Sequence, residues 1–270
     1  MLETLPSTRS RSTLDSVHVF CAGALLFTWA LQLPAVLAKV GVLPGPVERF
    51  VPLAALGGFG PLVVALLVAR FEPGGSGIRG LFRRLKIWRV GAGWYAVALG
   101  LLPAVYVVAV AIYRSAGGEV PWFFPPVMAQ HVAALLVVPF VEEVGWRGFA
   151  LPRLQQRYSA LSASLILGVV WCLYHVMMFV LQDMPGTLFA VGMADVFVGS
   201  VIFSWVYNHT RGSLSLAVLL HMSAHLNNPT HAVPDVRPLA IQTLAVAVLA
   251  AVLLIADRKA WRAPYVEQTP

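Results

Sequence analysis

The chain has 270 residues, of which 59% are hydrophobic and only 11% are charged. Soluble domains carry roughly 25% charged residues, so this composition indicates a membrane protein and excludes an ordinary soluble domain. The formal net charge of +7 does not indicate nucleic-acid binding, because the basic residues are spread between apolar runs.

Eight apolar segments follow one another along the chain. They cover residues 17–38, 50–69, 90–113, 127–150, 161–182, 187–207, 213–227 and 238–256. A helix needs about 20 residues to cross the hydrocarbon core, and all of these segments except the short 213–227 meet that length. We therefore expect an all-α polytopic membrane protein with about eight transmembrane helices. It forms a single domain, 17–258, with tails at 1–16 and 259–270.

The basic residues gather in alternate connections between these segments. One side receives Arg9, Arg11, Arg70, Arg79, Arg83, Arg84, Lys86, Arg89, Arg147, Arg153, Arg157, Arg211, Arg258, Lys259 and Arg262. The other side receives Lys39, Arg49, Arg114 and Arg237. Because cytoplasmic loops carry the excess of lysine and arginine, this bias places both termini in the cytoplasm.

Ionisable residues inside apolar segments are candidates for function, because burying them in a membrane costs free energy. The candidates are Glu142, Glu143, Arg147, His175, Asp195, His221 and His225, with His131 as a weaker one. For each there is a plainer alternative. The two glutamates could mark the membrane interface, and the histidines and Asp195 could be hydrogen-bonded packing residues.

Helix geometry separates the two adjacent glutamates. Glu143 and Arg147 are four residues apart and share a helix face, within reach of an ion pair. Glu142 points about 100° away from that face and has no such local partner. A buried carboxylate without a cation suits a general base, so we expect Glu143 to be structural and Glu142 to be chemical.

The histidines are less specific when taken singly. His175 follows Trp171 by one helical turn in "WCLYH". His221 and His225 share a face, but the glutamate of an H-E-x-x-H zinc motif is missing between them. A zincin is therefore not supported.

Three stretches together resemble the CPBP family, which contains the CAAX prenyl endopeptidases, the Abi proteins and bacteriocin-processing enzymes. "EEVGWRGFALPRLQQR" resembles the first motif, E-E-x-x-x-R followed by G-F/Y. "WCLYH" stands in the place of the second, F-x-x-x-H, with Trp171 where Phe is usual. "RGSLSLAVLLHMSAH" resembles the last, H-x-x-x-N/D, with His225 where Asn or Asp is usual. The resemblance covers the motif core, 142–228.

The resemblance implies an intramembrane endopeptidase whose site lies in a cavity open to the cytoplasm. By position, Glu142 matches the glutamate that acts on the catalytic water, Glu143 and Arg147 the supporting pair, and His175 and His221 the essential histidines. His221, with His225 in the doubtful last position, would stabilise the oxyanion. The family is often described as metalloproteases, and Glu142, His175 and His221 could hold Zn²⁺. A metal-free, glutamate-activated water fits the same residues, and we favour it.

Two other functions fit the same residues. A non-catalytic member of the family, such as a bacteriocin-immunity or scaffold protein, would use the polar residues to lock helix packing. A proton-coupled transporter would use them as a relay, although the chain shows no paired repeats. For a protease, the expected substrate is a peptide or protein, lipidated or membrane-embedded. The composition, rich in arginine, alanine and valine, favours a bacterial inner membrane.

Overall fold

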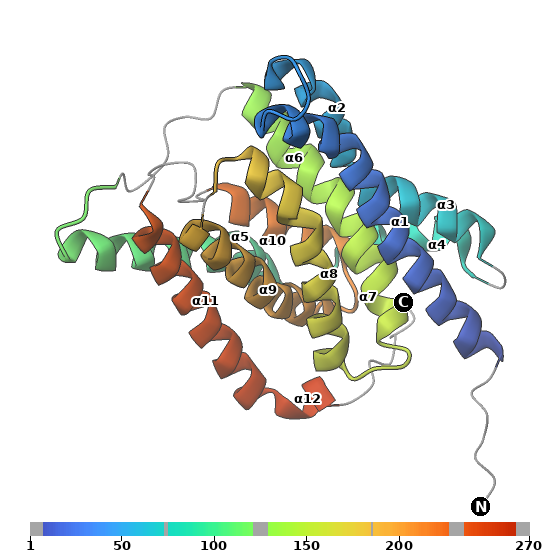
Figure 1. Cartoon of the computed structure of the whole chain (residues 1–270). Coiled ribbons are helices and arrows are strands. Elements are labelled where there is room, and N and C mark those ends of the chain that lie inside the picture. The colour runs from blue at the N-terminus through green and yellow to red at the C-terminus, as the bar shows by residue number, and fades with distance from the viewer. Residues whose placement is uncertain (1–7, 73–74, 121–128, 185, 227–234, 263–270) are drawn as a thin grey trace, which may run out of the picture.

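The computed structural model describes residues 8–72, 75–120, 129–184, 186–226 and 235–262 (Figure 1). Within these ranges the regular structure is entirely helical, with no β-strand. Five of the helices are long and apolar enough to cross a membrane. The prediction of an all-α polytopic membrane protein is therefore confirmed.

The helices follow the chain as a series of long crossings joined by short helical turns. The first part contains α1 (Thr8–Lys39), η1 (Val47–Arg49), α2 (Val51–Gly57), α3 (Gly60–Phe71), α4 (Gly77–Arg83), η2 (Arg84–Lys86) and α5 (Ala92–Ser115). The second part contains α6 (Ala129–Glu143), the π-helix η3 (Val144–Ala150), α7 (Leu151–Leu154), α8 (Ala160–Leu181), α9 (Gly186–His209), α10 (Leu214–Leu226), α11 (Val236–Ala256) and α12 (Arg258–Arg262). Residues 8–16 and 258–262, mostly assigned to the tails by the sequence, are thus helical where the structure describes them.

Judged by helix length and composition, the described residues contain fewer membrane crossings than the eight apolar segments predict. The five long helices are Asp15–Lys39, α5, α8, α9 and α11, and α2 with α3 forms a sixth crossing if the bent pair is counted as one. The segments around α6 and α10 do not meet the length criterion, because their α-helices contain only 15 and 13 residues. Eight crossings therefore remain a prediction.

The predicted second span is broken into α2 and α3, which meet at an angle of 43°. A Cβ on Gly57 would lie 2.9 Å from the carbonyl oxygen of Thr28 in α1. The Thr28 hydroxyl donates a 2.8 Å hydrogen bond to the Gly57 carbonyl. The glycine thus lets α2 approach α1 closely, and the threonine satisfies a carbonyl that the break leaves without its helical donor.

The second half of the bundle carries the ionisable candidates. α8 packs on α9, α9 on α11, and α10 lies against α5, α6 and α9. At the contact of α8 with α9, the hydroxyls of Ser164 and Ser200 each donate to the other residue's carbonyl, at 3.1 and 3.0 Å. Small hydroxyl residues let two apolar helices approach closely, which fixes the register of the helix that carries His175.

Segments far apart in sequence meet at one end of the bundle, and this end is rich in arginine. Ser213 and Ser215 donate to the carbonyls of Ile87 and Leu85, at 2.5 and 2.7 Å. The Arg211 guanidinium donates to the carbonyl of Arg89. The charge bias seen along the sequence is therefore also a bias between the two ends of the fold.

An ion pair at the same end ties α3 to α7. Arg153 donates to Glu72 at 3.1 and 2.5 Å, and the Ser16 hydroxyl donates to the same carboxylate. Burial raises the pKa of Glu72, but these hydrogen bonds and the positive charge of Arg153 outweigh it, so the pKa lies below its usual value. The carboxylate therefore stays charged and anchors the segment that follows the candidate site.

Candidate functional site

The candidate site begins where α6 changes into a π-helix. Glu142 and Glu143 end α6, and all seven residues of η3 are buried. Pro152 follows in α7 and has no backbone N–H to continue the α-helical hydrogen bonds of the preceding turn. π-Helical turns are rare and often lie at functional sites, so the unusual backbone coincides with the unusual carboxylate pair.

The π-helical segment lies very close to α3. A Cβ on Gly145 would be 2.6 Å from Cβ of Pro61 and 2.7 Å from its carbonyl oxygen. Backbone atoms cannot move aside as a flexible side chain can. Glycine is therefore the residue that this contact requires.

We expect Gly145→Ala to destabilise the protein by about 1–3 kcal/mol, because the added methyl overpacks a backbone contact. The matched control is Gly100→Ala in α5, where a Cβ would meet nothing within 4 Å. Thermal unfolding in detergent measures both variants. Equal melting temperatures for the two would contradict the close approach.

Glu143 is at the centre of a buried cluster of charges. Its Oε1 accepts a 2.9 Å hydrogen bond from Arg147 and a 2.8 Å hydrogen bond from Nδ1 of His221. The carboxylate and the guanidinium are fully buried. The ion pair expected from the spacing of Glu143 and Arg147 is present, and the structure adds His221 from α10 as a third member.

The Arg147 guanidinium lies between two aromatic rings. Its central carbon is 4.3 Å from the ring centroid of Trp171 and 4.5 Å from that of Phe203. Its Nε and Nη2 have no hydrogen-bond partner among the described residues. Cation–π contacts therefore supply part of the stabilisation that water would give an exposed guanidinium.

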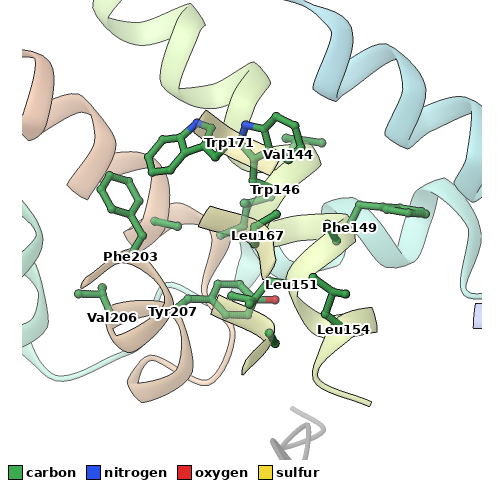
Figure 2. Close-up of a cluster of buried hydrophobic side chains, with 14 of the residues drawn as sticks. Val144, Trp146, Phe149, Leu151, Leu154, Leu167, Trp171, Phe203, Val206 and Tyr207 are labelled. Carbon is green, nitrogen blue, oxygen red and sulfur yellow. The ribbon is translucent and has the colours of Figure 1, made fainter. Parts of the chain in front are cut away.

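Glu142 has different partners. Its Oε2 accepts a 2.8 Å hydrogen bond from the indole of Trp171 and a longer one, 3.4 Å, from the indole of Trp146. Figure 2 shows these two tryptophans next to each other at one end of the buried apolar cluster. Among the described residues no cation bonds to Glu142, and no hydrogen bond joins it to His175. The expected separation of the two glutamates, one ion-paired and one not, is what the structure contains.

Two of the three histidines have a fixed proton position. Nδ1 of His175 lies 2.7 Å from the carbonyl oxygen of Trp171, and a carbonyl can only accept, so Nδ1 carries the hydrogen. Nδ1 of His221 donates to the Glu143 carboxylate in the same way. In the neutral ring, Nε2 of each is then an acceptor. His225 stacks on His221, with ring centroids 4.9 Å apart and planes at 12°.

A cavity of about 170 Å³ brings the three histidines together. His175, His221 and His225 line it, and its volume is enough for several water molecules. The lining extends along α8 and α11 to Gln182 and Leu239. These two residues lie toward the arginine-poor end of the bundle.

The cavity does not have Glu142 among its lining residues, whereas Trp171 is one of them. Trp171 thus contacts both the Glu142 carboxylate and the cavity that the histidines line. Asp195 also lines this cavity and accepts a 3.0 Å hydrogen bond from Thr243, which joins α9 to α11. The side chain of His131 lies outside the described residues.

The acid and histidine side chains are not arranged as a metal site in the part of the chain that the structure describes. Among the described residues no group of three His, Cys, Asp or Glu side chains could hold a metal ion. The predicted ligand set of Glu142, His175 and His221 is therefore not found as a metal site. Oε2 of Glu142 and Nδ1 of each histidine are already bonded, which leaves Oε1 and the two Nε2 atoms, and these do not come together as a ligand group among the described residues. The arrangement does not fit a metal, and the mechanism below contains no metal step.

Sequence reasoning missed the two tryptophans as partners of Glu142. Trp146 stands four residues after Glu142, the spacing at which helical side chains meet, and Trp171 stands one turn before His175. An indole N–H is a donor that usually finds a partner when buried. That rule, applied to these positions, would have pointed to the carboxylate.

The part of the chain that carries this site is similar to known proteins. Residues 123–227 match the family model described as type II CAAX prenyl endopeptidase Rce1-like. CAAX prenyl protease 2 of Methanococcus maripaludis is 28% identical over 174 residues. The match covers 59% of this chain and 64% of that relative, a little less than two thirds of its length.

Fold and site together define a polytopic α-helical membrane protein with a buried acid–histidine centre. The matched part, residues 123–227, is similar to the CAAX prenyl endopeptidases, the group within the family that the sequence motifs resemble.

Proposed function

We propose that the protein is an intramembrane endopeptidase that hydrolyses a peptide bond with a water molecule activated by Glu142. The observation that carries the proposal is the position of this carboxylate. It is 3% exposed and has no cation bonded to it among the described residues. It accepts a hydrogen bond from Trp171, and Trp171 also lines the cavity that contains the three histidines. A buried carboxylate of this kind is a competent proton acceptor.

In the proposed reaction Glu142 and Nε2 of His175 accept the two hydrogen atoms of the water. Glu142 removes one proton as the water oxygen attacks the carbonyl carbon of the scissile peptide bond. The proton then passes to the departing amine as the carbon–nitrogen bond breaks. The new carboxylic acid releases the second proton of the water to solvent, which leaves a carboxylate and an amine. Nδ1 of His175 is held by the Trp171 carbonyl, so its Nε2 is in the tautomer that this role requires.

The oxyanion of the tetrahedral intermediate would be stabilised by His221. Since Nδ1 donates to Glu143, Nε2 can donate only when the ring is protonated. Oε1 of Glu143 accepts from both Arg147 and His221, so the supporting pair sets the position of the ring. His225 stacks on His221 and is the proposed second donor in the place of the usual Asn or Asp. Donors of this kind stabilise the transition state by about 3–4 kcal/mol.

The substrate proposed is a peptide or protein segment at the membrane, and the printed name of the archaeal relative suggests a prenylated C-terminal segment. We place the protein in a bacterial inner membrane with the arginine-rich end and both termini in the cytoplasm. The described cavity extends toward the arginine-poor end, which is the end away from the cytoplasm in this orientation. Entry of substrate from the cytoplasm is therefore proposed from the family resemblance and not from this cavity.

The proposal is tested with the full chain reconstituted in lipid bicelles. Quenched fluorescent peptides are supplied with and without a farnesyl group, in water enriched in ¹⁸O. We expect cleavage at one bond and one ¹⁸O atom in the new carboxylate, as direct attack by water requires. A folded protein that cleaves neither peptide would overturn the protease proposal and favour a non-catalytic member of the family.

A further inference from the structure

Trp171 contacts four side chains of the candidate site, those of Glu142, Arg147, His175 and His221. Its indole N–H donates the shorter of the two hydrogen bonds to Glu142, at 2.8 Å. The side chain is 5% exposed and also lines the cavity. No water is needed to join the carboxylate to the ring.

The rest of the indole holds the neighbouring groups. Its face lies under the Arg147 guanidinium, at 4.3 Å. The rings of His175 and His221 both lie with their centroids 5.6 Å from it and nearly perpendicular to it, at 72° and 81°. One rigid side chain therefore fixes the distance between the carboxylate on α6 and the imidazoles on α8 and α10.

We infer that Trp171 is a positioning residue that holds Glu142 through its indole N–H and leaves the other carboxylate oxygen, Oε1, for the water. The inference rests on the proposed function of Glu142. A hydrogen bond to a carboxylate stabilises its charged form, which is the form a general base needs. It also fixes the rotation of the carboxylate, so that Oε1 is presented in one direction.

Trp146 cannot take over this role. Its hydrogen bond to the same oxygen is 3.4 Å long, near the limit of a hydrogen bond. It contacts α8 through Tyr174, with ring centroids 5.5 Å apart, and among the described residues no ring contact joins it to His175 or His221. The ring of Trp171 provides that connection.

The decisive variant is Trp171→Phe, which keeps an aromatic face for Arg147 and removes the N–H. We expect kcat to fall roughly tenfold to a hundredfold, the effect of losing one hydrogen bond to a charged group, with KM within about twofold of wild type. The pH profile of kcat should also change, because the charged carboxylate has lost its donor. The matched control is Trp205→Phe, which removes an indole bonded at 3.2 Å to Asp257, away from the site.

A second measurement does not depend on activity. In protein labelled with ¹⁵N-tryptophan, the indole resonance that disappears in Trp171→Phe belongs to Trp171. We expect this resonance to move with pH in wild type and to stay fixed in Glu142→Gln. Identical indole spectra of the wild type and Glu142→Gln at every pH would overturn the inference, and this comparison does not require Trp171→Phe to fold.

The outcomes also separate this inference from the proposed function. An active wild type, an inactive Glu142→Gln variant and an unchanged pH profile in Trp171→Phe would refute the positioning role alone. A wild type that cleaves no peptide would refute the protease while the indole resonance still reports the hydrogen bond.

Discussion

Glu142→Gln is expected to abolish peptide cleavage, with kcat lower by about 10²–10⁴, the range typical for loss of a general base. The amide has nearly the same shape as the carboxylate, and its carbonyl oxygen can still accept from the indoles of Trp171 and Trp146. It cannot accept a proton from water at neutral pH. The loss should therefore be in kcat rather than in folding, and cleavage of a quenched peptide by the reconstituted chain measures it.

The matched control is Glu119→Gln, because Glu119 is an exposed carboxylate after α5. Its amide variant should cleave the peptide at the wild-type rate. The melting temperature of Glu142→Gln should stay close to that of the wild type, since no cation loses its partner. Full activity in Glu142→Gln would end the assignment of this residue as the base.

The fold class could be predicted because it depends on composition and on the length of apolar runs. The number of crossings could not, for two local reasons. The helix that ends at Glu143 passes into a π-helix, and the break between α2 and α3 depends on a glycine that contacts α1. Hydropathy gives the length of an apolar segment but not the backbone conformation of that segment.

The contacts of the site also fall into those that the sequence could predict and those that it could not. The ion pair of Glu143 with Arg147 follows from a spacing of four residues, which is local information. The bond from His221 to Glu143 joins residues 78 positions apart, and only the resemblance of the motifs suggested that they meet. The indole of Trp171 reaches Glu142 from another helix, 29 positions away. Such a contact depends on how α6 and α8 pack, which single-sequence reasoning does not give.

Replacing Arg147 should have the largest effect on stability. We expect Arg147→Met to destabilise the protein by about 3–5 kcal/mol, because removing one partner of a buried ion pair leaves an uncompensated charge. Here that charge is Glu143, which is 0% exposed and, among the residues that the structure describes, retains only His221 as a partner. Thermal unfolding of the purified protein in detergent measures the change.

A double variant separates the charge from the packing. Glu143→Leu with Arg147→Met removes both charges, and replacing a buried pair by apolar side chains is often neutral for stability. We expect this protein to regain most of the lost stability and to remain inactive, because His221 no longer has the carboxylate that orients its Nδ1.

The surface pair of Lys39 with Asp183 provides the comparison, since the Asp183 side chain is 82% exposed. Lys39→Met should change the stability by less than about 1 kcal/mol. If Arg147→Met destabilised the protein as little as Lys39→Met does, the cluster of Glu143, Arg147 and His221 could not be a desolvated charge network. The proposed control of His221 by Glu143 would then lose its physical basis.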